Sequence, residues 1–348
     1  MTRQVDPGVV WDNHACLPFS DTERWLPEIA RYRRAGANAV TINIGDSHVP
    51  LATLERMAGT IRRYLQSHPD EYVLGLSTGD IRAARAGGRL AVCLDIEGVF
   101  SFGDDLSLVG HFYGLGVRWM LLVYNRANLA GSGCHDPDDR GLTAHGRAIL
   151  AEMDRVGMIK CCSHTGYRTA REILDSTDRP VIFSHSNPRR LHDHPRNIPD
   201  GLIRACAATG GVVGINGIGL FLGAREPTAD HVVRAIDHVV QLVGAEHAAL
   251  ALDYMFRKGE LQEPGRANPD LWPPEWGYGS GAGTVPPEAI PEIAAGLERL
   301  GYGTAAVQGV MGENLMRVAG AVWQPPSPPV GKQRTPYKPH GEGSTGAA

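Results

Sequence analysis

The chain has 348 residues, of which 43% are hydrophobic and 21% charged. This composition supports a large hydrophobic core and excludes wholesale disorder. The net charge of -4 argues against nucleic acid or an anionic membrane as the main partner. No apolar run approaches the roughly 18–20 residues of a transmembrane helix, and the N-terminus lacks the apolar stretch of a signal peptide, so we expect a cytoplasmic protein.

Short apolar segments alternate with amphipathic segments along most of the chain. The apolar segments predict strands over 9–11, 39–44, 72–76, 90–96, 117–124, 158–163, 180–184, 211–216 and 248–252. The amphipathic segments predict helices over 21–35, 51–66, 78–86, 106–115, 143–156, 169–174, 200–208 and 229–243. We expect Ser20 or Asp21 to cap the first of these helices.

Strands that alternate with helices indicate parallel βαβ units, and the fold class that we predict is α/β, a (β/α)₈ TIM barrel. The pattern offers nine strands for the eight positions of a barrel, and 72–76 is the segment that we leave out. An open doubly wound sheet is the alternative. No G-x-G-x-x-G follows the first strand, so the dinucleotide-binding form of that sheet has no support.

The alternation stops after Asp253. Residues 255–285 are rich in Gly, Pro and Trp, which predicts an irregular loop near the mouth of the barrel. Two terminal helices are predicted over 286–300 and 304–322. We therefore expect one catalytic barrel domain over 1–323, followed over 324–348 by a disordered tail rich in Pro and Gly.

Five predicted strands end in a residue that can bind a metal ion or a proton. These residues are His14, Glu97, His164, His185 and Asp253. In a barrel all strand C-termini open onto one face, where active sites are built. His164 and His185 are 21 residues apart, about one strand–helix–strand repeat, so we expect them on neighbouring strands.

Imidazoles and carboxylates that converge on one mouth indicate a divalent metal site, most naturally for zinc. Such a metal makes hydroxide available at neutral pH by lowering the pKa of bound water to about 7. Glu97 suits a bridge between two metals, and Asp253 suits a general base. A single histidine at a strand end is more often structural, but five such residues favour a shared site. We interpret His135 and the pair His192 and His194 as ordinary polar-loop residues.

Several segments resemble the renal, or membrane, dipeptidases of peptidase family M19, which are amidohydrolase-like metal-dependent barrels. The similarity runs from about Val10 to Val318. Its most specific segments are PVIFSHSNPRRLHDHPRNIPD, CCSHTG, LDIEG, LALDY and MGENLMRV.

The resemblance implies a binuclear zinc site. It makes Glu97 the bridging glutamate, His164 and His185 the ligands of the second metal, and His14 a ligand of the first. It also makes Asp253 the residue that handles the protons of water and leaving group. The resemblance also implies that Arg196 binds the substrate carboxylate. The forked guanidinium group suits this role because it can pair with both carboxylate oxygens.

Two positions depart from the family pattern. Cys16 stands where the family has a metal-binding aspartate, so either its thiolate binds zinc or the site holds one metal instead of two. Tyr124 stands where the renal enzyme has a substrate-facing histidine, and it could donate a hydrogen bond to a carbonyl or an oxyanion.

We predict from these residues a zinc-dependent hydrolase of small amides, first of all a dipeptidase with a small-molecule or dipeptide substrate. One alternative is a metal-dependent hydrolase of a lactone, an acylated amino acid or a cyclic amide. Another is a barrel that only binds a ligand. The resemblance also implies a homodimer.

Overall fold

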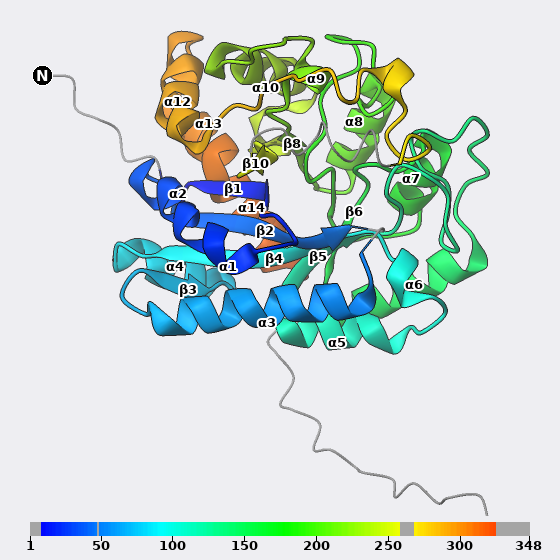
Figure 1. The fold of residues 1–348 in the computed structure, drawn as a ribbon. Coiled ribbons are helices and arrows are strands. Elements are labelled where there is room, and N and C mark those ends of the chain that lie inside the picture. The colour runs from blue at the N-terminus through cyan, green and yellow to red at the C-terminus, as the bar shows by residue number, and fades with distance from the viewer. Residues whose placement is uncertain (1–7, 47–48, 258–267, 325–348) are drawn as a thin grey trace, which may run out of the picture.

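The computed structural model describes residues 8–46, 49–257 and 268–324. Parallel strands form the centre of the molecule, and helices cover them on the outside (Figure 1). The predicted tail lies outside the described residues except for Gln324, as do residues 258–267 of the predicted mouth loop.

The central sheet has the strand order β10-β1-β2-β4-β5-β6-β7, and β8 pairs with β9 in a second sheet. The two sheets meet at a parallel bridge between Phe183 and Val213 on one side, while β10 pairs with β1 on the other. β9 and β10 are separated only by residues 251–253 and together fill one position, so the nine labelled strands form eight positions and confirm the predicted barrel. Its strands are β1 Trp11–Cys16, β2 Ala39–Asp46, β4 Leu90–Glu97, β5 Val117–Leu121, β6 Ile159–Cys161, β7 Val181–Ile182, β8 Val213–Ile215, β9 Ala248–Leu250 and β10 Tyr254–Met255.

The remaining strand, β3 Tyr72–Leu74, pairs only with β4 and lies off the path of the barrel. It is the segment that the strand count led us to leave out. It pairs with residues 90–92 of β4, where that edge is open because β5 pairs with β4 only from Leu94 onward.

The helices follow the predicted alternation. They are α1 Thr22–Trp25, α2 Ala30–Arg34, α3 Leu51–Ser67, α4 Thr78–Ala86, α5 Ser107–Leu115, α6 Ala144–Val156, α7 Tyr167–Asp175, α8 Asp200–Ala208, α9 Gly219–Leu222, α10 Ala229–Val243, α12 Ile290–Arg299, α13 Thr304–Gln308 and α14 Asn314–Val322. The first predicted helix is broken between α1 and α2 by a 3₁₀ turn, Leu26–Ile29, which has Pro27 as its second residue. Asp21 makes no side-chain cap.

Alternate residues along the strands divide the core into two layers. On β4, Val92 and Leu94 join the layer between sheet and helices, whereas Ala91 and Cys93 point into the barrel. The inner layer includes residues of α14, such as Leu315 and Val318. The interior is therefore filled below the ends of the strands, and the site can form only above this layer.

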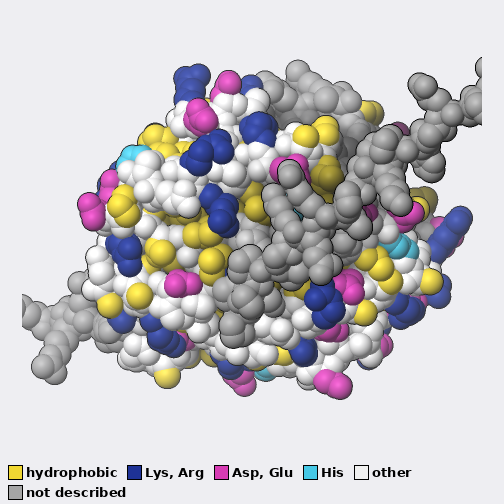
Figure 2. Space-filling model, turned by 90° about the horizontal axis from the view of Figure 1, so that it is seen from below, with side chains coloured by type: hydrophobic (Ala, Val, Ile, Leu, Met, Phe, Trp, Pro, Cys, Tyr) yellow, Lys and Arg dark blue, Asp and Glu magenta, His cyan; other side chains and the backbone are white. Residues whose placement is uncertain are grey.

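The outer surface carries both signs of charge. Figure 2 shows basic and acidic side chains interspersed on the face seen from below, with small hydrophobic groups between them. None of the helices in the described part of the chain combines the length and the apolar character needed to cross a membrane.

Candidate metal centre

The structure brings the five predicted strand-end residues to one mouth of the barrel. His14 lies on β1 and Glu97 ends β4. The other three follow the short strands β6, β7 and β9 after a few residues of extended or turning backbone, and all five side chains are at most 10% exposed. The residues are His14, Glu97, His164, His185 and Asp253.

Glu97 lies at the centre of the three imidazoles. Its Oε1 is 3.0 Å from Nε2 of His185 and 3.3 Å from Nε2 of His164. Its Oε2 is 3.6 Å from Nε2 of His14. The two neighbouring histidines, His164 and His185, approach to 3.0 Å between their Nε2 atoms, as expected for adjacent strands.

Cys16 and Asp253 complete a second group around His14. The Cys16 Sγ is 3.5 Å from His14 Nε2 and 3.6 Å from Asp253 Oδ1. Asp253 Oδ1 is in turn 3.5 Å from His14 Nε2. Cys16 therefore lies where the family pattern places a ligand, and Asp253 lies close enough to take part in the same group.

These separations fit the donor spacing of a bound metal. Ligands about 2.0–2.3 Å from a tetrahedral zinc ion lie about 3.4 Å from one another. In the described residues, two groups keep their ligand atoms within 4.8 Å of one another: His14 with Cys16 and Asp253, and His14 with Glu97 and His185. His164 belongs to the second group through its short distances to Glu97 and His185.

Each imidazole is oriented by a partner at its other nitrogen. Nδ1 of His14 is 3.1 Å from Asp95 Oδ2, Nδ1 of His164 is 2.7 Å from Asn125 Oδ1, and Nδ1 of His185 is 2.7 Å from Ser184 Oγ. Asp95 and Asn125 Oδ1 can only accept, so the hydrogens of His14 and His164 lie on Nδ1. Their Nε2 lone pairs then face the oxygens of Glu97. Such an assembly of acceptors suits a cation.

The pKa shifts favour a positive charge on His14 and neutral imidazoles at His164 and His185. Burial alone would raise the pKa of Glu97, but His14, His185 and His164 hold it well below its usual range. Burial alone would lower the pKa of His14, but Asp95, Cys16 and Glu97 hold it well above. Burial and the Arg196 guanidinium lower the pKa of His164 to about 3. The carboxylates and the thiol around His14 thus favour a positive charge at this position.

The backbone is left-handed at three site positions that are not glycine. Asn125, His164 and Asp253 have φ of 59°, 62° and 53°. Asn, Asp and His tolerate this region better than other residues, although it still costs free energy. The turn at each position directs the side chain back over the barrel axis.

Tyr124 and Arg196 lie beside the cluster. The ring of Tyr124 stacks on His164 with 4.1 Å between centroids, and burial holds its pKa well above the usual range, so it stays a neutral donor. Arg196 is 2% exposed, and it donates to the carbonyl oxygen of His185 at 2.7 Å and to Ser186 Oγ at 2.9 Å. The sequence-predicted residues are thus all gathered at one mouth.

Sequence reasoning missed the residues that hold the ligands. Asp95 lies two positions before Glu97 on β4, so both point inward, and a carboxylate inside an apolar strand is a signal that could have found it. Asn125 and Asn216, which donates to Asp253 Oδ2 at 2.7 Å, had no such signal. The interpretation of His135 and His194 as ordinary polar-loop residues was wrong, because they are only 7% and 3% exposed.

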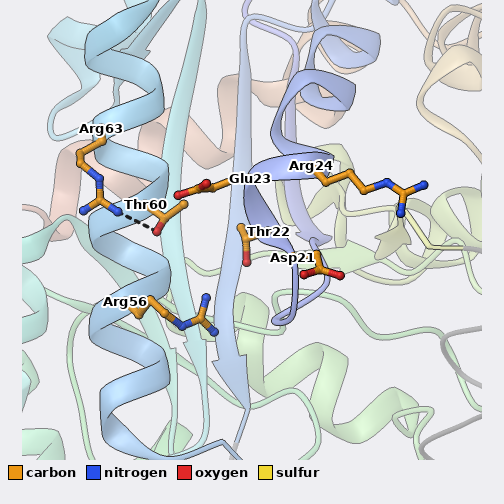
Figure 3. Close-up of a pocket in the computed structure, with 7 residues that line it drawn as sticks. All are labelled: Asp21, Thr22, Glu23, Arg24, Arg56, Thr60 and Arg63. Carbon is orange, nitrogen blue, oxygen red and sulfur yellow. Dashed lines mark hydrogen bonds between the residues drawn. The ribbon is translucent and has the colours of Figure 1, made fainter.

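A separate hollow lies between α1 and α3, away from these residues. In Figure 3, side chains of α3 face Thr22 and Glu23 across it, whereas Arg24 points away. Arg63 donates to Thr60 Oγ1 at 3.0 Å, and Arg56 donates to the carbonyl oxygen of Phe19. The residues that line it include none of the five strand-end residues.

Solved structures share this fold. An amidohydrolase from Pseudomonas aeruginosa is 27% identical with a TM-score of 0.80, and the match covers 91% of this chain and 97% of that one. A metallo peptidase from Rhodobacter sphaeroides, solved with a phosphinate mimic of the dipeptide L-Ala-D-Ala, is 19% identical with a TM-score of 0.74, covering 91% and 100%.

Curated relatives are named dipeptidases. An uncharacterized dipeptidase of Schizosaccharomyces pombe (strain 972 / ATCC 24843) is 32% identical over 76% of this chain and 61% of its own length. Dipeptidase verJ of Clonostachys rogersoniana is 28% identical over 71% and 60%. The chain thus spans about three fifths of these two relatives. The model of the family "Membrane dipeptidase (Peptidase family M19)" matches residues 37–265, and the chain belongs to this family.

Proposed function

We propose that this chain is a zinc-dependent hydrolase of small amides, and first of all a dipeptidase. The observation that carries the proposal is the convergence of three Nε2 atoms, a carboxylate and a thiol at metal-ligand spacing on one barrel mouth. Membership of the M19 family and the dipeptidase names of the relatives support the substrate class.

Two zinc ions would be held by these residues, and Glu97 would be a ligand in both groups. His14 and Cys16 would hold the first, and His164 and His185 the second. If the Cys16 thiol does not ligate, one zinc remains. When bound, the metal supplies Lewis acidity and lowers the pKa of water.

The remaining residues would position the substrate and move protons. Asp253 Oδ1 would accept the proton of the attacking water and pass it to the leaving amine, while Asn216 fixes the other oxygen. Tyr124, kept protonated by burial, would donate to the developing oxyanion. The guanidinium of Arg196 would hold the substrate carboxylate.

The test is turnover of a panel of L,L-, L,D- and β-linked dipeptides by the zinc-loaded full chain and by Asp253→Asn. We expect hydrolysis of at least one dipeptide, a loss of at least about a hundredfold in kcat in the variant, and nearly unchanged zinc content. The exposed Asp230→Asn on α10 is the control. Retained activity in Asp253→Asn would remove this carboxylate from the mechanism.

Tyr124 and Cys16 favour a second candidate substrate class, because both depart from the family pattern. Inactivity of the zinc-loaded chain on every dipeptide, with hydrolysis of a lactone, an acylated amino acid or a cyclic amide, would support it. Cytoplasmic location and a homodimer stay predictions.

A further inference from the structure

A second phenol reaches the edge of the metal-ligand cluster from the segment between β10 and α12. Tyr278 is only 6% exposed, although its segment is irregular. It lies between Gly277 and Gly279, which both have φ of 83°. Glycine adopts this conformation without strain, so these two positions let the backbone turn the ring inward. A Cβ at position 277 would also lie 2.7 Å from Cδ1 of Leu220.

His135 holds the hydroxyl group of Tyr278. Its Nε2 lies 2.9 Å from Tyr278 Oη, and the two rings meet edge to face at 88°. Within the described residues, Nδ1 of His135 is buried without a hydrogen-bond partner. A buried N–H without an acceptor is rarer than an unpaired acceptor, so we assign the ring hydrogen to Nε2, which donates to Tyr278. The phenol hydrogen is then left to donate to another group.

On one side, this pair adjoins the support of His164. The backbone N–H of His135 donates to the carbonyl oxygen of Asn125 at 2.9 Å. The side chain of the same Asn125 bonds to Nδ1 of His164 at 2.7 Å. His135 is therefore fixed relative to one of the proposed metal ligands.

On the other side, the pair adjoins the support of Asp253. Tyr278 packs in one hydrophobic cluster with Ile218 and Trp272, and Tyr124 packs against that cluster. The backbone N–H of Ile218 donates to Asn216 Oδ1 at 2.7 Å, and Asn216 holds Asp253. The phenol of Tyr278 thus lies between the supports of the two halves of the site.

The charges around Tyr278 agree with this position. Burial holds its pKa well above the usual range; Cys134 and Asp253 add to that shift, and the Arg196 guanidinium opposes it. A side-chain hydrogen bond with Asn125 also opposes the shift, and the hydroxyl group is protonated at neutral pH. Phe221 links Tyr278 to Arg196, because its ring centroid lies 6.1 Å from that of Tyr278 and 5.7 Å from the guanidinium carbon of Arg196.

We propose that Tyr278, oriented by His135, donates a hydrogen bond to the substrate carboxylate beside Arg196, and that the site thereby selects small amides with a free carboxylate. This inference rests on the proposed function. The two terminal nitrogens of Arg196 already donate to His185 and Ser186. A carboxylate accepts about four hydrogen bonds. The hydroxyl group of Tyr278 can therefore donate to a lone pair of the substrate carboxylate that Arg196 does not use.

The test measures binding to the zinc-loaded full chain by calorimetry, which needs no turnover. The probes are a phosphinate mimic of L-Ala-D-Ala and the same mimic with a C-terminal amide. A hydrogen bond to a charged group corresponds to about a tenfold to hundredfold change in Kd. We expect Tyr278→Phe to weaken binding of the carboxylate form by at least about tenfold and to leave the amide form unchanged. Tyr64→Phe on α3 is the control.

His135 is a positioning residue in this arrangement. We expect His135→Leu to lose part of the preference for the carboxylate form, and His135→Gln, which keeps an N–H donor, to retain most of it. If the role of these residues is merely structural, the variants should bind both probes more weakly to the same extent, and that result would overturn the proposal. Unchanged binding of the carboxylate form by Tyr278→Phe would overturn it as well. So would failure of the wild type to bind the carboxylate mimic. Binding of the mimic without hydrolysis of any dipeptide would refute the proposed function and leave this inference intact.

Discussion

Replacing Asp95 with asparagine would test whether the support of His14 sets metal affinity. Asp95 is fully buried, its Oδ2 lies 3.1 Å from Nδ1 of His14, and its Oδ1 accepts from Asn43 at 2.7 Å. The variant has nearly the same volume, so it removes the charge and leaves the packing. Loss of such a partner costs a metal site about tenfold to a hundredfold in affinity, which is about 1.4 to 2.7 kcal/mol.

The assay is competition for zinc between the chain and a chromophoric chelator at pH 7, with thermal unfolding as a check on folding. Asp230→Asn, an exposed carboxylate on α10, should bind zinc like the wild type. If Asp95→Asn also binds zinc like the wild type while remaining folded, the charge of Asp95 does not tune the metal affinity of the site.

Three further predictions concern Cys16, the backbone beside Asn125, and His135. Cys16→Ala should lower the zinc content from two per chain to one, and Cys16→Asp should restore it; equal zinc in all three would exclude the thiolate as a ligand. Gly133→Ala places a Cβ 2.2 Å from the carbonyl of Asn125, so it should lower the free energy of unfolding by about 1–3 kcal/mol and weaken zinc binding. Gly114→Ala on α5, with nothing within 4 Å, should not destabilise the chain in the same denaturant titration. Burial lowers the pKa of His135 to about 2 in the folded chain. The unfolded chain takes up a proton on this histidine below its pKa of about 6.5, so the free energy of unfolding should fall by about 2 kcal/mol between pH 7 and 5. Urea titrations in which His135→Gln loses as much stability as the wild type would contradict this.

The barrel could be predicted from sequence because its signals are local. Eight apolar segments separated by amphipathic ones define the strands of the ring. The polar residues that end them then had to share one face, because all parallel strands point the same way. The predicted site required His164 and His185 to lie on neighbouring strands, and the 3.0 Å between their Nε2 atoms follows from that topology.

The supports of the ligands were harder to predict because they depend on contacts between distant segments. Asn125 belongs to the loop after β5, yet its partner is His164 after β6. His194 looked like a polar-loop residue from its neighbours Asp193 and Pro195. In the fold, Nε2 of His194 bonds to the carbonyl oxygen of Trp276, and the ring is buried. Sequence pattern and composition describe only the neighbours of a residue along the chain. The burial of His194 depends on a segment about 80 residues away, so neither could predict it.

Three residues of the site have a left-handed backbone conformation, and interactions with the rest of the barrel offset its free-energy cost. Asn125, His164 and Asp253 occupy a region that costs of order 1 kcal/mol each, and all three lie at the mouth. Backbone hydrogen bonds hold these turns: the Cys134 N–H donates to the His164 carbonyl, and the Asp253 N–H donates to the His14 carbonyl, both at 2.9 Å. Because these bonds tie each turn to a neighbouring segment, the turns cannot relax without opening the barrel. The backbone that carries the three side chains is therefore fixed by hydrogen bonds to other segments of the barrel, and these bonds offset the cost of its left-handed conformation.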